Sequence, residues 1–116
     1  MIGRHLILEH WGGLMGEAVL EAAMREAARA GGAHVLSAQF HPFEGGGVTG
    51  VLLLAESHIS VHTWPEHDYA ALDLFMCGTA DVEAAADALD EALRPRRSDR
   101  RILVRGALRP SMKIDA

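Results

Sequence analysis

The segment 51–64 has the sequence VLLLAESHISVHTW, and it decides the kind of fold that the chain can adopt. Its first five residues are apolar, as in a buried β-strand, whereas Ile59–Trp64 alternates apolar and polar side chains, as in a half-buried strand. Glu56-Ser57-His58 lies between the two runs. The segment therefore predicts two consecutive strands that place a short polar stretch at a strand end, where catalytic groups are often found.

The same patterns continue on both sides of this segment and predict further strands and two helices. Gly31-Gly32 marks the end of the first helix, Asp81 is expected to cap the second, and Pro95 ends it. The expected strands are 6–8, 34–40, 48–55, 59–64, 70–77 and 102–108, and the expected helices are 15–30 and 82–93. The order β-α-β-β-β-β-α-β predicts an α+β fold, a two-layer sandwich of a mostly antiparallel sheet with helices on one face. Residues 1–116 are expected to form a single domain.

The composition is that of a folded domain and argues against nucleic acid and membrane as partners. Hydrophobic residues make up 49% of the 116, which is enough for a packed core, and the formal net charge of −5 argues against nucleic acid as a partner. The six arginines between positions 94 and 105 are interpreted as a solvated helix end and loop. No apolar run is long enough to span a membrane, and the N-terminus lacks the apolar core of a signal peptide, so a cytoplasmic location is expected.

The residues alone leave three interpretations of the polar segment open. His58, His62 and Glu66 could bind a metal ion, since zinc needs three or four converging ligands. Ser57 and His62 could form a hydrolase pair, although the Gly-x-Ser-x-Gly turn is absent. The third interpretation is a set of ordinary half-buried strand residues.

Strand geometry adds a constraint on this segment. Ser57 and His62 are an odd number of residues apart and would point to opposite faces of a regular strand. Either a bulge separates them or Ser57 lies at a turn. In 70–77, the face that carries Cys77 is opposite the leucine face expected to pack on the helices. A second protomer should then cover the Cys77 face, which predicts a homodimer.

Beyond these patterns, the sequence resembles the short prokaryotic class of S-adenosylmethionine decarboxylases over nearly the whole chain up to Gly78. The matching motifs are GRHL at 3–6, FHPF at 40–43, GVTG at 47–50, ESH at 56–58, HTWPE at 62–66 and YAALDLFMCG at 69–78. The resemblance implies a self-processing enzyme of polyamine biosynthesis that cuts itself between Glu56 and Ser57, giving chains 1–56 and 57–116. The implied cofactor is a pyruvoyl group derived from Ser57, with no metal. It would form a Schiff base with the substrate, promote loss of CO2 and leave a carbanion to be protonated.

Roles for individual residues follow from the same resemblance. It implies that Ser57, His62 and Cys77 are catalytic, with Cys77 as the proton donor to the substrate carbon. It also implies that Glu56, Ser57, His62 and Thr49 take part in processing, and that Phe43, Trp64 and Glu66 line the substrate pocket, with Phe43 packing on adenine.

The loop 44–47 and the segment 10–16 differ from the usual pattern of the family, and both are expected to border the substrate. Relatives on this scaffold that act on L-arginine or L-ornithine therefore remain an alternative, with Glu44 as a partner for the cationic side chain. S-adenosylmethionine is favoured because Phe43 and Trp64 suit an adenine ring. A second alternative is an uncleaved, non-enzymatic binding or regulatory module.

Overall fold

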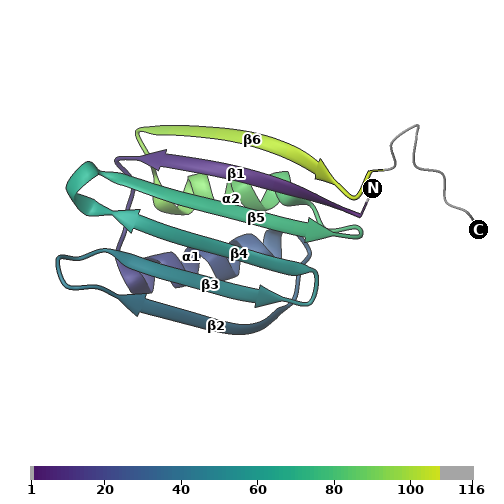
Figure 1. Cartoon of the computed structure of the whole chain (residues 1–116), viewed down its shortest axis with the longest axis horizontal. Coiled ribbons are helices and arrows are strands. Elements are labelled where there is room, and N and C mark those ends of the chain that lie inside the picture. The colour runs from purple at the N-terminus through teal and green to yellow at the C-terminus, as the bar shows by residue number, and fades with distance from the viewer. Residues whose placement is uncertain (1, 108–116) are drawn as a thin grey trace, which may run out of the picture.

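The computed structural model describes residues 2–107, which form six strands, two α-helices and one turn of 3-10 helix (Figure 1). All neighbouring strands are antiparallel, in the order β2-β3-β4-β5-β1-β6, and the helices lie together behind the sheet in Figure 1. The predicted two-layer α+β fold is confirmed. The elements are β1 (Gly3–Trp11), α1 (Glu17–Ala30), β2 (Val35–Pro42), β3 (Val48–Leu54), β4 (Ser57–Trp64), η1 (Pro65–His67), β5 (Tyr69–Cys77), α2 (Val82–Leu93) and β6 (Arg97–Arg105).

The core lies between the helices and one face of the sheet. Along β5 every second residue is buried, as the strand period of two requires when one face is covered. The buried residues of β5 are Ala70, Leu72, Leu74 and Met76. They belong to the same core as Leu20 and Met24 of α1 and Leu89 of α2. The alternation seen in the sequence therefore identifies the covered face correctly.

The ends of the two helices also match the sequence signals. α1 stops at Ala30, and Gly32 has φ +76°, a backbone conformation that favours glycine. The Asp81 side chain accepts hydrogen bonds from the backbone N–H groups of Glu83 and Ala84, so the predicted cap of α2 is confirmed.

The last strand differs from its expected position. β6 runs from Arg97 to Arg105 and pairs with β1 along its whole length, whereas 102–108 was expected. Three arginines expected in the loop, Arg97, Arg100 and Arg101, are therefore strand residues. Arg100 contributes to this difference, because it reaches over to α2 and pairs with Asp87 and Asp90. Leu108, the expected end of the strand, lies outside the described residues.

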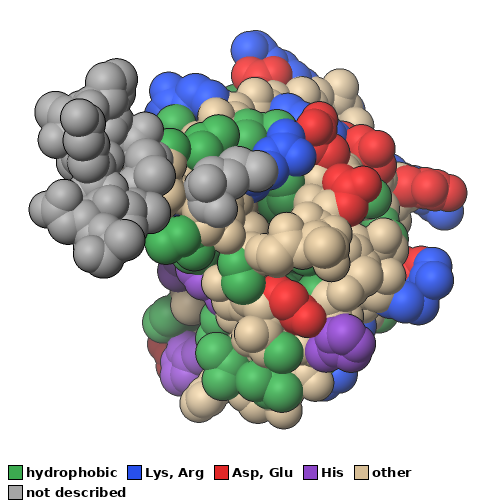
Figure 2. Space-filling view, turned by 90° about the vertical axis from the view of Figure 1, so that its right-hand side faces the viewer, with side chains coloured by type: hydrophobic (Ala, Val, Ile, Leu, Met, Phe, Trp, Pro, Cys, Tyr) green, Lys and Arg blue, Asp and Glu red, His purple; other side chains and the backbone are tan. Residues whose placement is uncertain are grey.

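The second face of the sheet carries no helix in the described part of the chain. Cys77 is on this face, as predicted, and so are the exposed side chains of Val51 and Leu53. Figure 2, which views the right-hand end of Figure 1, shows most acidic side chains on the right, and histidine side chains on both sides of the lower half. Neither helix within residues 2–107 is long and apolar enough to cross a membrane.

Candidate active site

Ser57 lies at the first position of β4, directly after the tight turn that joins it to β3. Its φ of 138° is far from the values that an L-residue with a side chain prefers. Such a conformation costs about 1–3 kcal/mol, and it persists only where the surroundings hold the chain in place. The pairing of β4 with both neighbours is regular, so Ser57 stands at a turn and no bulge separates it from His62.

The peptide group before Ser57 is held by hydrogen bonds from two sides. The backbone N–H of Cys77 donates to the carbonyl oxygen of Glu56 at 3.1 Å. The carboxylate of Glu56 accepts bonds from the backbone N–H and from Nδ1 of His34, each at 2.9 Å. These bonds, led by that of the His34 side chain, hold the pKa of the Glu56 carboxyl below its usual range. The backbone at Ser57 is therefore strained, and the Glu56 carbonyl before it is held and polarised by the hydrogen bond from Cys77.

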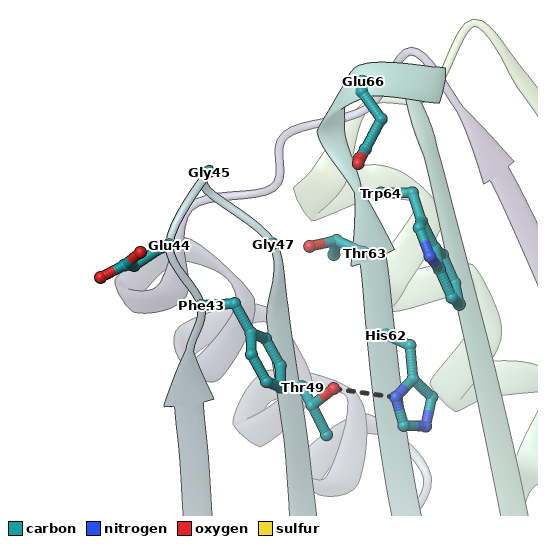
Figure 3. A pocket seen from close by; sticks show the side chains of 9 residues that line it. All are labelled: Phe43, Glu44, Gly45, Gly47, Thr49, His62, Thr63, Trp64 and Glu66. Atoms are coloured by element: carbon teal, nitrogen blue, oxygen red, sulfur yellow. Dashed lines mark hydrogen bonds between the residues drawn. The ribbon is translucent and has the colours of Figure 1, made fainter.

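A second group of candidate residues surrounds a cavity of about 340 Å3 between the β2–β3 loop and the end of β4 (Figure 3). The Thr49 hydroxyl lies 3.0 Å from Nδ1 of His62, which fixes the orientation of the imidazole. Trp64 stacks on Tyr69, with ring centroids 5.7 Å apart. The candidates that line the cavity are Phe43, Glu44, Thr49, His62, Trp64 and Glu66.

These two groups lie at opposite ends of the sheet. In Figure 1 the β3–β4 turn lies at the right-hand end, and the loop between β2 and β3 lies at the left-hand end. Five residues along β4 separate Ser57 from His62, a distance of about 16 Å at the usual rise of a strand. Cys77 lies at the Ser57 end, because Ser57 pairs with Met76. One chain therefore does not bring Ser57 and Cys77 together with His62 and Thr49, and the intrachain Ser57–His62 hydrolase pair is excluded.

The metal site considered from the sequence is also wrong. His58 and His62 share a face of β4, but four residues separate them by about 13 Å. His58 instead meets Asp73 of β5, where its Nε2 lies 2.9 Å from Oδ2, and the same oxygen lies 2.6 Å from Nε2 of His5 in β1. His5, His58 and Asp73 form the group among the described residues whose ligand atoms lie close enough together for an ion.

This cluster joins three strands on the open face and was not predicted from the sequence. Asp73 lies opposite Ser60, and both histidines are its diagonal neighbours, so only the register of the sheet places them together. Burial raises the pKa of the Asp73 carboxyl, but hydrogen bonds from Ser60, His58 and His5 outweigh this effect and lower it. The one available sequence signal was the presence of His5 in the GRHL motif.

Comparisons with known proteins show the family to which the chain is related. Residues 4–106 match the S-adenosylmethionine decarboxylase family. A protein of Methanococcus aeolicus named S-adenosylmethionine decarboxylase proenzyme is 41% identical over 112 residues, covering 92% of this chain and 96% of its own. One of the same name from Brevibacillus brevis is 43% identical over 97% of this chain and 92% of its own. The crystal structure of the Aquifex aeolicus adenosylmethionine decarboxylase superposes with a TM-score of 0.83 and 30% identity over 97% of both chains.

The fold, the strained serine and these matches together define a pyruvoyl-dependent carboxy-lyase that is made as a proenzyme. The chain belongs to the S-adenosylmethionine decarboxylase family.

Proposed function

We propose that the chain cuts itself between Glu56 and Ser57, converts Ser57 into the pyruvoyl group, and decarboxylates S-adenosylmethionine in a site shared by two copies of the chain. The observation that carries the proposal is the strained Ser57 next to a carbonyl that already accepts a hydrogen bond from Cys77. The experiment that tests the activity is a side-by-side assay of CO2 release from S-adenosylmethionine, L-arginine and L-ornithine.

The local geometry suits the formation of a pyruvoyl group from Ser57. The Ser57 hydroxyl attacks the carbonyl carbon of Glu56 and the Ser57 nitrogen leaves, so that an ester replaces the amide. The N–H of Cys77 is placed to stabilise the negative charge that develops on the carbonyl oxygen. A base then removes the Cα proton of residue 57, and the Cβ–O bond breaks, which frees the Glu56 carboxylate. Addition of water to the remaining dehydroalanine and loss of ammonia leave the ketone.

A second copy of the chain would complete the site. The open face of the sheet carries exposed Val51 and Leu53 together with Cys77, and a second copy packed on it would remove this surface from water. If a two-fold axis relates the copies and their strands run in opposite directions, the Ser57 end of one lies over the His62 end of the other. Each site would then combine Ser57 and Cys77 of one protomer with Thr49 and His62 of its partner.

In such a site each group has a defined task. A pyruvoyl group at residue 57 would supply a ketone that can bind the substrate amine and take up the electron pair left by CO2. His62, held at Nδ1 by Thr49, exchanges protons through Nε2. The Cys77 thiol is half-buried on the open face and supplies a proton to the substrate carbon. Phe43 and Trp64 offer exposed ring faces to the adenine ring at the cavity.

The role of Cys77 can be tested separately from cleavage. Cys77→Ala keeps the backbone N–H that bonds to Glu56, so the chain should still be cleaved. Without the thiol, turnover should fall about 100-fold or more, the usual contribution of a general acid. The carbanion would also be protonated at the wrong carbon, which transfers the amine to the pyruvoyl group, so activity should decay during the assay. Wild-type turnover by Cys77→Ala would show that this thiol is only a strand residue.

Substrate choice is tested by three variants measured on the same three amino acids. Phe43→Ala and Trp64→Ala should each weaken binding of S-adenosylmethionine by about 0.5–1.5 kcal/mol beyond lost burial, or about 2- to 13-fold in KM. Cleavage should be unaffected, because neither ring supplies a group that attacks the Glu56 carbonyl or exchanges a proton. Glu44→Gln, which alters a neighbouring residue of the same cavity, serves as the matched control. A large rise in KM with Glu44→Gln, and activity on arginine or ornithine alone, would assign the site to those substrates.

A further inference from the structure

Cleavage creates a new chain end at the residue that carries the pyruvoyl group. In the intact chain, residue 57 is held from both directions, by the β3–β4 turn and by β4 itself. After cleavage it is attached only to His58, and free chain ends fray unless they are tied down. The ketone must nevertheless stay in position, since a displacement of about 1 Å in an active site can cost about 100-fold in rate.

His58 is tied down through its side chain. Its Nε2 lies 2.9 Å from Oδ2 of Asp73, a diagonal neighbour on β5. A carboxylate only accepts hydrogen bonds, so His58 donates its Nε2 proton to Asp73. Both side chains are partly shielded from water, with 35% of the His58 and 26% of the Asp73 side chain exposed, which strengthens the bond.

Asp73 is in turn held by hydrogen bonds from side chains of β4 and β1. Ser60, opposite it on β4, donates its hydroxyl to Oδ1, and His5 of β1 donates from Nε2 to Oδ2 at 2.6 Å. Arg105 of β6 lies 3.4 Å from Nδ1 of His5 and stacks on the ring of Phe75, 4.8 Å from its centroid. The carboxylate is therefore a rigid point to which the new chain end can be attached.

We propose, on the basis of the proposed function, that Asp73 is a positioning residue that holds the pyruvoyl group in place by anchoring His58 after cleavage. Before cleavage the anchor is dispensable, because the covalent chain holds residue 57 on both sides. After cleavage His58 keeps its backbone pairing with Leu53 and Phe75, and the bond to Asp73 is the side-chain contact that fixes its position further. Loss of the anchor should therefore lower kcat while leaving cleavage and substrate binding nearly unchanged.

Hydrogen bonding accounts for this cluster better than a bound metal ion does. A histidine that binds a metal through Nε2 keeps its proton on Nδ1, and in His5 that nitrogen faces the guanidinium of Arg105, which can only donate. As a hydrogen-bonded cluster, His5 accepts from Arg105 and donates to Asp73 without conflict. Treatment of the purified enzyme with EDTA should therefore leave its activity unchanged, and a loss that zinc restores would overturn the proposal.

The main test is Asp73→Asn, whose amide group cannot accept from all three donors at once. Cleavage should go to completion, and phenylhydrazine should label the ketone to the same extent as in the wild type. The kcat per labelled site should fall about 10- to 100-fold, with KM for S-adenosylmethionine changed by less than about threefold. Asp87→Asn is the matched control, because Asp87 lies exposed on α2 and pairs with Arg100.

A pair of variants at position 58 separates anchoring from general damage. His58→Gln keeps a donor near the position of Nε2 and should restore most of the turnover, whereas His58→Leu should resemble Asp73→Asn. Amide hydrogen exchange gives a readout that does not depend on activity. Exchange at residues 58–60 should be faster in cleaved Asp73→Asn than in the cleaved wild type. It should be unchanged when Asp73→Asn is introduced into the uncleaved Ser57→Ala chain.

Each negative result would overturn a different part of the proposal. A wild-type chain that is never cleaved would overturn the proposed function, and this inference with it. If the wild type is cleaved and active, equal kcat in Asp73→Asn overturns only the anchoring role. A folded Asp73→Asn chain that fails to cleave would overturn it as well, because Asp73 would then act before the chain end exists.

Discussion

Ser57→Ala is expected to leave the chain at its full length and without decarboxylase activity. The substitution removes the one oxygen that can attack the Glu56 carbonyl from the adjoining residue, so neither the ester nor the ketone can form. Intact-mass measurement of the wild type should show a fragment 1–56 ending in a carboxylate and a fragment 57–116 that resists Edman degradation. The variant should show a single species, so the expected effect is all or none.

The experiment needs evidence that Ser57→Ala still folds and that the loss of cleavage is specific to residue 57. Alanine at 57 keeps a Cβ and hence the unfavourable φ of 138°, so the fold should be no less stable than that of the uncleaved wild type. Ser37→Ala, at an exposed serine of β2, should cleave as the wild type does. Decarboxylation by the full-length Ser57→Ala chain would refute the self-processing mechanism.

The fold was predictable where one face of an element is covered. Leu72, Leu74 and Met76 alternate with less buried residues, and this period assigns both the strand and its covered face. Prediction failed at β6, because Arg97, Arg100 and Arg101 lack the apolar alternation of a half-buried strand. The strand forms there because β6 pairs with the edge of β1 along its whole length. A local sequence pattern does not reveal such pairing with a distant strand.

The sequence supplied candidate residues for the site but not their arrangement in space. The resemblance supplied Ser57, His62 and Cys77, and the odd spacing between the first two correctly indicated a conflict. The strand register showed in addition that the two residues lie far apart. His62 pairs with Thr49, whereas Ser57 pairs with Leu54 at the other end of β3. Asp73 was overlooked because its hydrogen-bond partners lie on two other strands, β1 and β4. The sequence does not show which residues of neighbouring strands lie opposite one another.

The separation of Ser57 from His62 also makes a sharp prediction about assembly. Ser57→Ala and His62→Ala should each prevent cleavage when the variant is made alone, since one lacks the nucleophile and the other lacks the proton-exchanging imidazole. When both are made in the same cell, mixed dimers form. In a mixed dimer, the intact Ser57 of the His62→Ala chain faces the intact His62 of the Ser57→Ala chain. The His62→Ala chain should then be cleaved.

With random pairing, about half of the His62→Ala chains should be cleaved, and none of the Ser57→Ala chains. Different affinity tags allow mass measurement to assign the fragments. Replacing the Ser57→Ala partner with a Ser57→Ala/His62→Ala double variant removes the donated imidazole and should abolish the rescue. If His62 acted within its own chain, mixing could restore nothing, because the chain with a serine would still lack its histidine. Cleavage in the mixture, together with its loss in the double-variant control, would therefore require both a dimer and a site built from two chains. An uncleaved mixture that contains mixed dimers would contradict the shared site.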